Sequence, residues 1–309
     1  MRREANLEVV DTKNEIREFL TSRRARITPE QAGLPTFGTT RRVPGLRREE
    51  VALLAGVSVD YYTRLERGNA SGVSDTVLEA LARALQLDDT ERAHLFDLAR
   101  ATQTSTPRRR RRVQQRIRPT VQHMLDAMAG LPAFVRNGRL DILGANGLGR
   151  ALYSGHFDGL AQPPNTARFV FLDGSAPTFY VEWERVANDV VAVLRAEAGR
   201  DPYDRDLSDL IGELSTRSEL FRTLWAAHNV RTHDTGLKRI HHPVVGELNL
   251  TFEAMELVAD PGLTMFVYTA EPGSKSEQAL NLLASWTATP DQESTHADHE
   301  DQPRHRRGA

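Results

Sequence analysis

The sequence predicts a multidomain protein in which an all-α region of five helices is followed by an α+β region. Apolar residues recur at helical spacing from residue 14 and, after a loop at residues 27–45, again up to about residue 100, which is typical of a small helical domain. Five consecutive arginines at residues 108–112 then interrupt the pattern, and their mutual repulsion keeps such a run solvated. Beyond this run, helical stripes lie between segments that alternate like strands, which indicates a sheet covered by helices on one face.

The length of 309 residues is sufficient for two ordinary domains. The tail has almost no large apolar residues, so it cannot build a core of its own. We expect a disordered N-terminus at residues 1–12, a helical domain at 13–100, an Arg-rich linker at 101–119, an α+β domain at 120–287 and a disordered tail at 288–309.

Composition and charge narrow the class of protein. The absence of cysteine excludes disulfides and thiolate metal sites and fits a reducing compartment. No apolar run has the length of a signal peptide or a membrane span, so we expect a cytoplasmic protein. Up to Arg118 the chain has 23 Lys and Arg against 16 Asp and Glu, and after it 17 against 26. The basic part suits a phosphate-bearing partner, although most of its excess is the arginine run.

The segment at residues 47–68 (RREEVALLAGVSVDYYTRLERG) has the pattern of a helix-turn-helix. Two short helices that cross steeply need a small residue at the crossing, here Ala52, and a turn that permits positive φ, here Gly56. Ser58 can cap the second helix and Gly68 can end it. A plain helical hairpin would explain the apolar stripe, but not the short or basic residues at the outward positions of the second helix.

The outward positions of this second helix are candidates for contact with double-stranded DNA. Arg64 could reach guanine O6 and N7, while Val59 and Thr63 could contact a thymine methyl group. Asp60 could accept from cytosine N4 or act only at the helix terminus, and Tyr61 could lie on the backbone or pack inward. The remaining arginines are suited to phosphate, which positions a protein without reading sequence. The candidate DNA-binding residues are Arg41, Arg42, Arg47, Arg48, Ser58, Val59, Asp60, Tyr61, Thr63, Arg64 and Arg67.

The ending "YYTRLERG" at residues 61–68 resembles the recognition-helix exit of the Xre (Cro-like phage-repressor) family. The resemblance spans about 60 residues and implies a repressor-like helix-turn-helix domain that binds DNA. The chain departs from the family at Arg47 and Arg48, where members usually have Thr-Gln or Ser-Gln, and the preceding loop is longer. The run at residues 108–112 could follow the DNA backbone or serve only as a solvated linker.

Strands and helices of the second region follow from local patterns. Asn137-Gly138 predicts a type I′ hairpin between residues 133–136 and 139–143. The glycines of residues 144–149 lack the dinucleotide-binding order and indicate a strand exit and a helix start. Apolar stripes indicate helices at residues 183–194, 207–214 and 220–225. Alternating apolar and polar residues indicate strands at residues 247–252 and 264–270, and a last apolar stripe indicates a closing helix at residues 280–286.

This layout, with the runs at residues 238–250 and 279–286, resembles the ligand-binding domain of MmyB-like regulators, and residues 43–52 (VPGLRREEVA) are similar to its actinobacterial members. The resemblance implies a PAS-like domain with a pocket for a small apolar ligand such as a fatty acid. Cationic residues could hold its carboxylate and aromatic residues could line the cavity, although surface exposure and core packing are the alternatives. The candidate ligand-binding residues are Trp225, Arg231, Lys238, His242, Phe252, Met255, Phe266 and Tyr268.

We expect neither a metal site nor a cofactor. His241 and His242 are adjacent, so in a strand they point to opposite faces, and the spacing of His228 and His233 fits no familiar ligand pair. No hydrolase, metalloprotease or phosphate-loop motif is present, so we expect no enzyme.

Together these patterns indicate a one-component transcriptional regulator that binds a pseudo-palindromic operator as a homodimer. Two alternatives stay open: a constitutive DNA-binding protein whose second domain only dimerises, and an enzyme fused to a DNA-binding domain.

Overall fold

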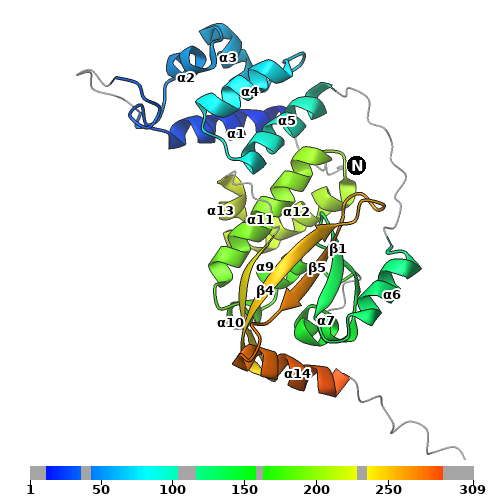
Figure 1. The fold of residues 1–309 in the computed structure, drawn as a ribbon. Coiled ribbons are helices and arrows are strands. Elements are labelled where there is room, and N and C mark those ends of the chain that lie inside the picture. The colour runs from blue at the N-terminus through cyan, green and yellow to red at the C-terminus, as the bar shows by residue number, and fades with distance from the viewer. Residues whose placement is uncertain (1–11, 36–42, 104–115, 158–162, 228–234, 288–309) are drawn as a thin grey trace, which may run out of the picture.

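The computed structural model describes residues 12–35, 43–103, 116–157, 163–227 and 235–287. Figure 1 shows a helical N-terminal domain stacked on an α+β domain. The expected disorder of residues 1–12 and 288–309 falls outside the described residues, apart from Thr12, which is helical. Most of the expected linker also falls outside them, including the arginine run at 108–112.

Five helices form the described part of the N-terminal domain, as the sequence predicted. The predicted cap at Ser58 is present, and Ser74 caps the next helix: each side chain accepts a hydrogen bond from a backbone N–H in the first turn of the following helix. Apolar residues from all five helices pack into one core, with Tyr62 and Leu81 fully enclosed. The helices are α1 (Thr12–Arg26), α2 (Arg48–Ala55), α3 (Val59–Glu66), α4 (Asp75–Ala84) and α5 (Asp89–Gln103).

The C-terminal domain combines an antiparallel sheet with nine helices in its described part. Its strands are β1 (Ala133–Asn137), β2 (Ile142–Ala145), β3 (Thr235–His242), β4 (Gly246–Glu256) and β5 (Leu263–Thr269). Its helices are α6 (Pro119–Ala127), α7 (Gly147–Leu152), α8 (Ser154–Phe157), α9 (Thr166–Leu172), α10 (Ala176–Phe179), α11 (Trp183–Arg200), α12 (Arg205–Arg217), α13 (Glu219–Ala226) and α14 (Lys275–Thr287).

The sheet has the strand order β2-β1-β5-β4-β3, and every neighbouring pair is antiparallel. Alternate residues of each strand face the main core, which the long helix α11 and its neighbours close. The sequence suggested helices on one face only, and this is incomplete: Val121 and Leu125 of α6 pack on the other face, against Val135 and Met265. The hydrophobic alternation of strands β1 and β5 is therefore broken, since both of their faces are buried.

The predicted type I′ turn at Asn137-Gly138 is wrong. A type I′ turn needs positive φ at both central residues, but the residue with positive φ in this hairpin is Leu140, at 68°. The Asn137 N–H donates to the Asp141 carbonyl (3.1 Å), so the loop consists of three residues and ends in a left-handed residue. Leu140 accepts this conformation because its side chain is fully buried in the main core.

Candidate DNA-binding surface and ligand cavity

Local capping fixes where helix α2 ends and helix α3 begins. Gly56 has φ 66° and ends α2, so the chain reverses in the left-handed conformation that glycine tolerates. The Ser58 hydroxyl then accepts a hydrogen bond from the Tyr61 N–H at 3.1 Å. Tyr62 and Leu65 anchor the inner side of α3 in the core.

The outer side of α3 carries the residues expected to contact bases. Val59 is 46% exposed, Asp60 and Arg64 are exposed, and Thr63 is half-buried. The Arg64 guanidinium lies 5.0 Å from the centre of the Tyr61 ring, which positions this long side chain by a cation–π contact. The sequence-predicted base contacts thus share one solvent-facing side of the helix, while their contact with DNA stays a prediction.

A buried charge cluster holds α3 against α1 and α2. Glu66 is 2% exposed. Its carboxylate pairs with Arg24 of α1 at 2.6 Å and with Arg48 of α2. Arg48 is one of the arginines that the sequence suggested for DNA contact, and its side chain remains about half exposed although it is paired with Glu66. The position of the recognition helix therefore depends on a carboxylate shared by two arginines.

The other arginines expected at phosphate are distributed around this surface. Arg47 is half-buried and pairs with Glu49 at 3.4 Å, and Arg67 is exposed at the end of α3. Arg41 and Arg42 lie outside the described residues.

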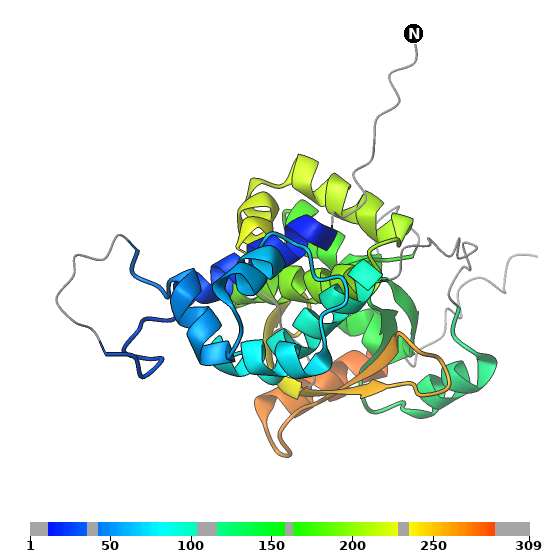
Figure 2. The same ribbon diagram turned by 90° about the horizontal axis from the view of Figure 1, so that it is seen from above.

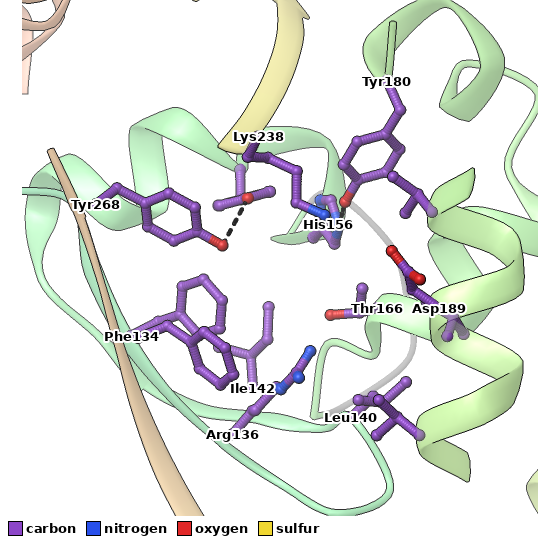
Figure 3. A pocket seen from close by; sticks show the side chains of 15 residues that line it. Phe134, Arg136, Leu140, Ile142, His156, Thr166, Tyr180, Asp189, Lys238 and Tyr268 are labelled. Atoms are coloured by element: carbon purple, nitrogen blue, oxygen red, sulfur yellow. Dashed lines mark hydrogen bonds between the residues drawn. The ribbon is translucent and has the colours of Figure 1, made fainter. Parts of the chain in front are cut away.

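The second candidate site is a cavity between the sheet and α11, shown in Figure 3. The empty space between its side chains is about 520 Å³ when its opening to solvent is included. The side chains that surround it come from the sheet and from α9, α11 and the segments before them: Phe134, Arg136, Leu140, Ile142, Tyr153, His156, Thr166, Tyr180, Val186, Asp189, Val190, Val193, Lys238, Phe266 and Tyr268.

Two cationic side chains reach into this cavity from different strands (Figure 3). The Arg136 guanidinium of β1 lies 4.1 Å from the centre of the Phe266 ring. The Lys238 ammonium of β3 lies 5.4 Å from the Tyr180 ring centre. Burial lowers the pKa of Arg136, and it lowers the pKa of Lys238 to about 8. Charged groups in such surroundings are costly unless an anion accompanies them.

The polar groups that face these cations are one carboxylate and several neutral groups. Asp189 of α11 is 5% exposed and its charge favours protonated Lys238. The Tyr153 hydroxyl donates to that of Tyr268 at 2.9 Å, and His156 Nε2 is hydrogen-bonded to the Tyr180 hydroxyl at 3.2 Å. Burial lowers the pKa of His156 to about 3, so its ring is neutral at physiological pH.

Three of the ligand-binding residues proposed from the sequence line this cavity, namely Lys238, Phe266 and Tyr268. Phe252 packs behind it, with its ring centre 5.8 Å from that of Tyr268. Met255 lies away from the cavity and is 44% exposed. Arg231 lies outside the described residues.

His242 and Trp225 have other surroundings. His242 Nδ1 accepts from the Val244 N–H at 3.2 Å, and its Nε2 donates to the Ala151 carbonyl at 3.0 Å. Trp225 stacks on Phe221 and contacts Arg195. Both side chains therefore organise the fold outside the cavity.

Sequence reasoning missed Arg136 and Asp189, although each carried a signal. Arg136 is two residues after Phe134 in a strand, so both point to the same, inward face. Asp189 follows Val186 by one helical turn, within the apolar stripe of α11. A charge in an apolar stripe was the available sign of a functional cavity.

The two domains meet where α1 and α5 pack against α11. Arg195 of α11 is 1% exposed, and its guanidinium forms an ion pair with Glu15 of α1 at 2.5 Å. The same group donates to the Trp225 carbonyl and lies 4.2 Å from the Trp225 ring centre. One turn further along α11, a Cβ atom on Gly199 would lie 2.5 Å from the His94 ring of α5. The absence of a side chain at Gly199 thus permits the close approach of the two helices.

The described residues also bear on metal binding and on membrane insertion. His241 is exposed and His242 is buried, so the pair points to opposite faces as expected. In the described segments, no three His, Asp or Glu side chains are grouped in a way that could hold a metal ion. None of the helices described there combines the length and the apolar character of a membrane span.

An exposed recognition helix joined to a cavity-bearing α+β domain defines the class of DNA-binding transcription regulators with a ligand-binding domain. Residues 15–95 match the helix-turn-helix domain family. Residues 117–283 match the family described as MmyB-like transcription regulator ligand binding domain, and the chain belongs to this family. Both resemblances inferred from the sequence are confirmed, and these are families of transcription regulators, not of enzymes. A comparison with curated proteins finds no match.

Proposed function

We propose that this regulator is a one-component sensor, in which a small molecule in the α+β cavity changes the affinity of the helix-turn-helix for its operator. One observation supports this most directly: α11 lines the cavity with Val186, Asp189 and Val193 and contacts the DNA-binding domain with Arg195 and Gly199. A ligand that moved or stiffened this helix would act on both domains through one rigid element.

The route continues from α11 to the recognition helix through α1. Glu15 near the start of α1 pairs with Arg195, while Arg24 near its end pairs with Glu66 of α3. Gly68, two residues after α3, approaches α1 so closely that a Cβ atom there would lie 2.2 Å from the Lys13 carbonyl oxygen. Helices α11 and α1 therefore form a continuous route between the cavity and the recognition helix. Coupling of this kind requires that the ligand bind the two states with different affinity.

The operator is expected to be pseudo-palindromic and the protein a homodimer, because one short recognition helix rarely supplies enough contacts. The family resemblance implies an apolar ligand such as a fatty acid, and a DNA-binding regulator is expected in the cytoplasm. Native mass spectrometry before and after organic extraction tests whether the protein is a dimer and whether it carries a ligand. A dimer mass with an extractable adduct supports the proposal, whereas a monomer that stays monomeric on operator DNA contradicts the dimer.

The coupling is tested by replacing Gly199 with alanine. The added methyl group collides with His94 and separates α11 from α5. We expect operator affinity to change by about fivefold or more, the lower range of allosteric coupling. Fluorescence anisotropy would measure it, with an operator selected by the full-length protein from random duplexes.

Gly212→Ala is the matched control, because Gly212 lies on α12 and a Cβ atom there meets nothing within 4 Å. It should bind the operator as the wild type does. If Gly199→Ala, shown to be folded by circular dichroism, also binds like the wild type, the interface does not transmit a signal. A constitutive DNA-binding protein would then be the better description.

A further inference from the structure

The charges and rings of the cavity narrow the chemical class of its ligand. We infer that the cavity binds a compact aromatic monocarboxylate bearing a hydroxyl group, with Arg136 as the carboxylate anchor. This inference rests on the proposed sensor function and names the molecule that would be sensed.

Arg136 has the geometry of an anchor. One face of its guanidinium is covered by the Phe266 ring, which leaves the N–H edge directed into the cavity (Figure 3). Among the described residues, none is placed within hydrogen-bonding or ion-pair distance of this group. A guanidinium presents its donors in a planar fork that matches the two oxygens of a carboxylate. A carboxylate that entered the cavity would therefore give Arg136 the anionic partner that the described residues do not supply.

The charge balance favours a single negative charge on the ligand. Arg136 and Lys238 supply two cations around the cavity, whereas its one lining carboxylate, Asp189, is also paired with Arg185 at 3.8 Å. His156 is neutral. A monoanion would offset the charge of Arg136, while a neutral molecule would leave this positive charge uncompensated in a largely apolar enclosure.

The lining favours a ring over an alkyl chain. Phe134, Tyr153, Tyr180, Phe266 and Tyr268 present aromatic surfaces, which suit offset stacking or edge contacts with another ring. Eight of the fifteen lining side chains carry polar atoms. The hydrocarbon part of a long chain would remove Lys238 and Thr166 from water without offering either a hydrogen-bond partner. A ring hydroxyl could instead donate to Asp189, which faces the cavity near Thr166 (Figure 3).

The experiment is calorimetric titration of the full-length protein with three probes: 4-hydroxybenzoate, its neutral isostere 4-hydroxybenzamide, and dodecanoate. We expect 4-hydroxybenzoate to bind at least about tenfold more tightly than either other probe, as the loss of a charge-assisted hydrogen bond implies. Arg136→Met should lower its affinity by about tenfold or more. Arg150→Met is the matched control, since Arg150 is exposed and lies over a different ring, that of Phe157.

The fold of each variant is checked by circular dichroism. Should Arg136→Met fail to fold, Arg136→Lys retains the charge but loses the planar fork, and it should still weaken 4-hydroxybenzoate binding by about fivefold. Tighter binding of dodecanoate, equal binding of the amide, or full affinity in a folded Arg136 variant would overturn the ligand class.

Operator affinity measured with and without each probe separates the two proposals. If 4-hydroxybenzoate binds through Arg136 and leaves DNA affinity unchanged, the ligand class stands and the sensor function is wrong. If dodecanoate alone binds and changes DNA affinity, the sensor function stands and the ligand class is wrong.

Discussion

The two domains of this regulator treat buried charge in opposite ways. In the helix-turn-helix domain, the buried carboxylates are shared by arginines: Glu66 pairs with Arg24 and Arg48, and Glu91 pairs with Arg23 and Arg26. In the α+β domain, the cavity contains more positive than negative charge.

This difference in charge pairing distinguishes a buried cluster with a structural role from a ligand-binding site. A buried ion pair that is complete within the chain holds helices in place and needs nothing further. A buried cation without an accompanying anion lowers stability until a ligand completes it. Removing charge should therefore have opposite effects on stability in the two domains.

The largest effect is expected for Glu66→Gln. The neutral amide leaves Arg24 and Arg48 without their shared carboxylate, and removing one partner of a buried pair is strongly destabilising. Because Arg48 is half exposed, we expect a loss of about 3 kcal/mol in the free energy of unfolding, measured by urea denaturation. Glu79→Gln is the control: Glu79 pairs with Arg92 on the surface and should unfold like the wild type. Equal losses in both variants would mean that burial of the cluster is not what stabilises the domain.

The second effect has the opposite sign. Burial lowers the pKa of Lys238 to about 8 from 10.5 in the unfolded chain. Between these pH values the unfolded state binds the extra proton, so the stability of the wild type rises with pH across this window. Lys238→Met removes that rise and should raise the free energy of unfolding at pH 7 by roughly 2–3 kcal/mol.

Denaturation at pH 7 and pH 10 measures this difference, with Lys275→Met as the control at an exposed lysine. A variant less stable than the wild type at pH 7 would show that Lys238 is already compensated in the free protein. The buried charges of the cavity would then be paired within the chain, as they are in the helix-turn-helix domain.

The smallest effect concerns binding. Arg64→Ala removes an exposed side chain from the outer face of α3. Specific DNA affinity should fall by about 1–3 kcal/mol, and base preference should relax at one position of the operator. Arg67→Ala should instead weaken binding to all sequences and reduce the salt dependence by about one charge. Unchanged base preference in Arg64→Ala would show that another face of α3 enters the groove.

Local signals made the helix-turn-helix predictable. Its helix spacing, the left-handed turn at Gly56 and the cap at Ser58 all depend on residues a few positions apart. The strands β4 and β5 were predictable for the same reason, since alternation is a property of neighbouring residues. The hairpin at Asn137 was mispredicted because Leu140 takes positive φ to bury its side chain in a distant core.

By itself, the sequence determined the class of both domains, the ends of the recognition helix and the resemblance to MmyB-like regulators. Periodicity, caps and motifs each depend on residues that are close together in the chain. Only the tertiary structure decided which side chains share the cavity, and it placed Trp225 at the domain interface beside Arg195. It also brought Arg136, Asp189 and Lys238 together from β1, α11 and β3. Such groupings depend on how distant segments pair and pack, and no pattern within one segment carries that information.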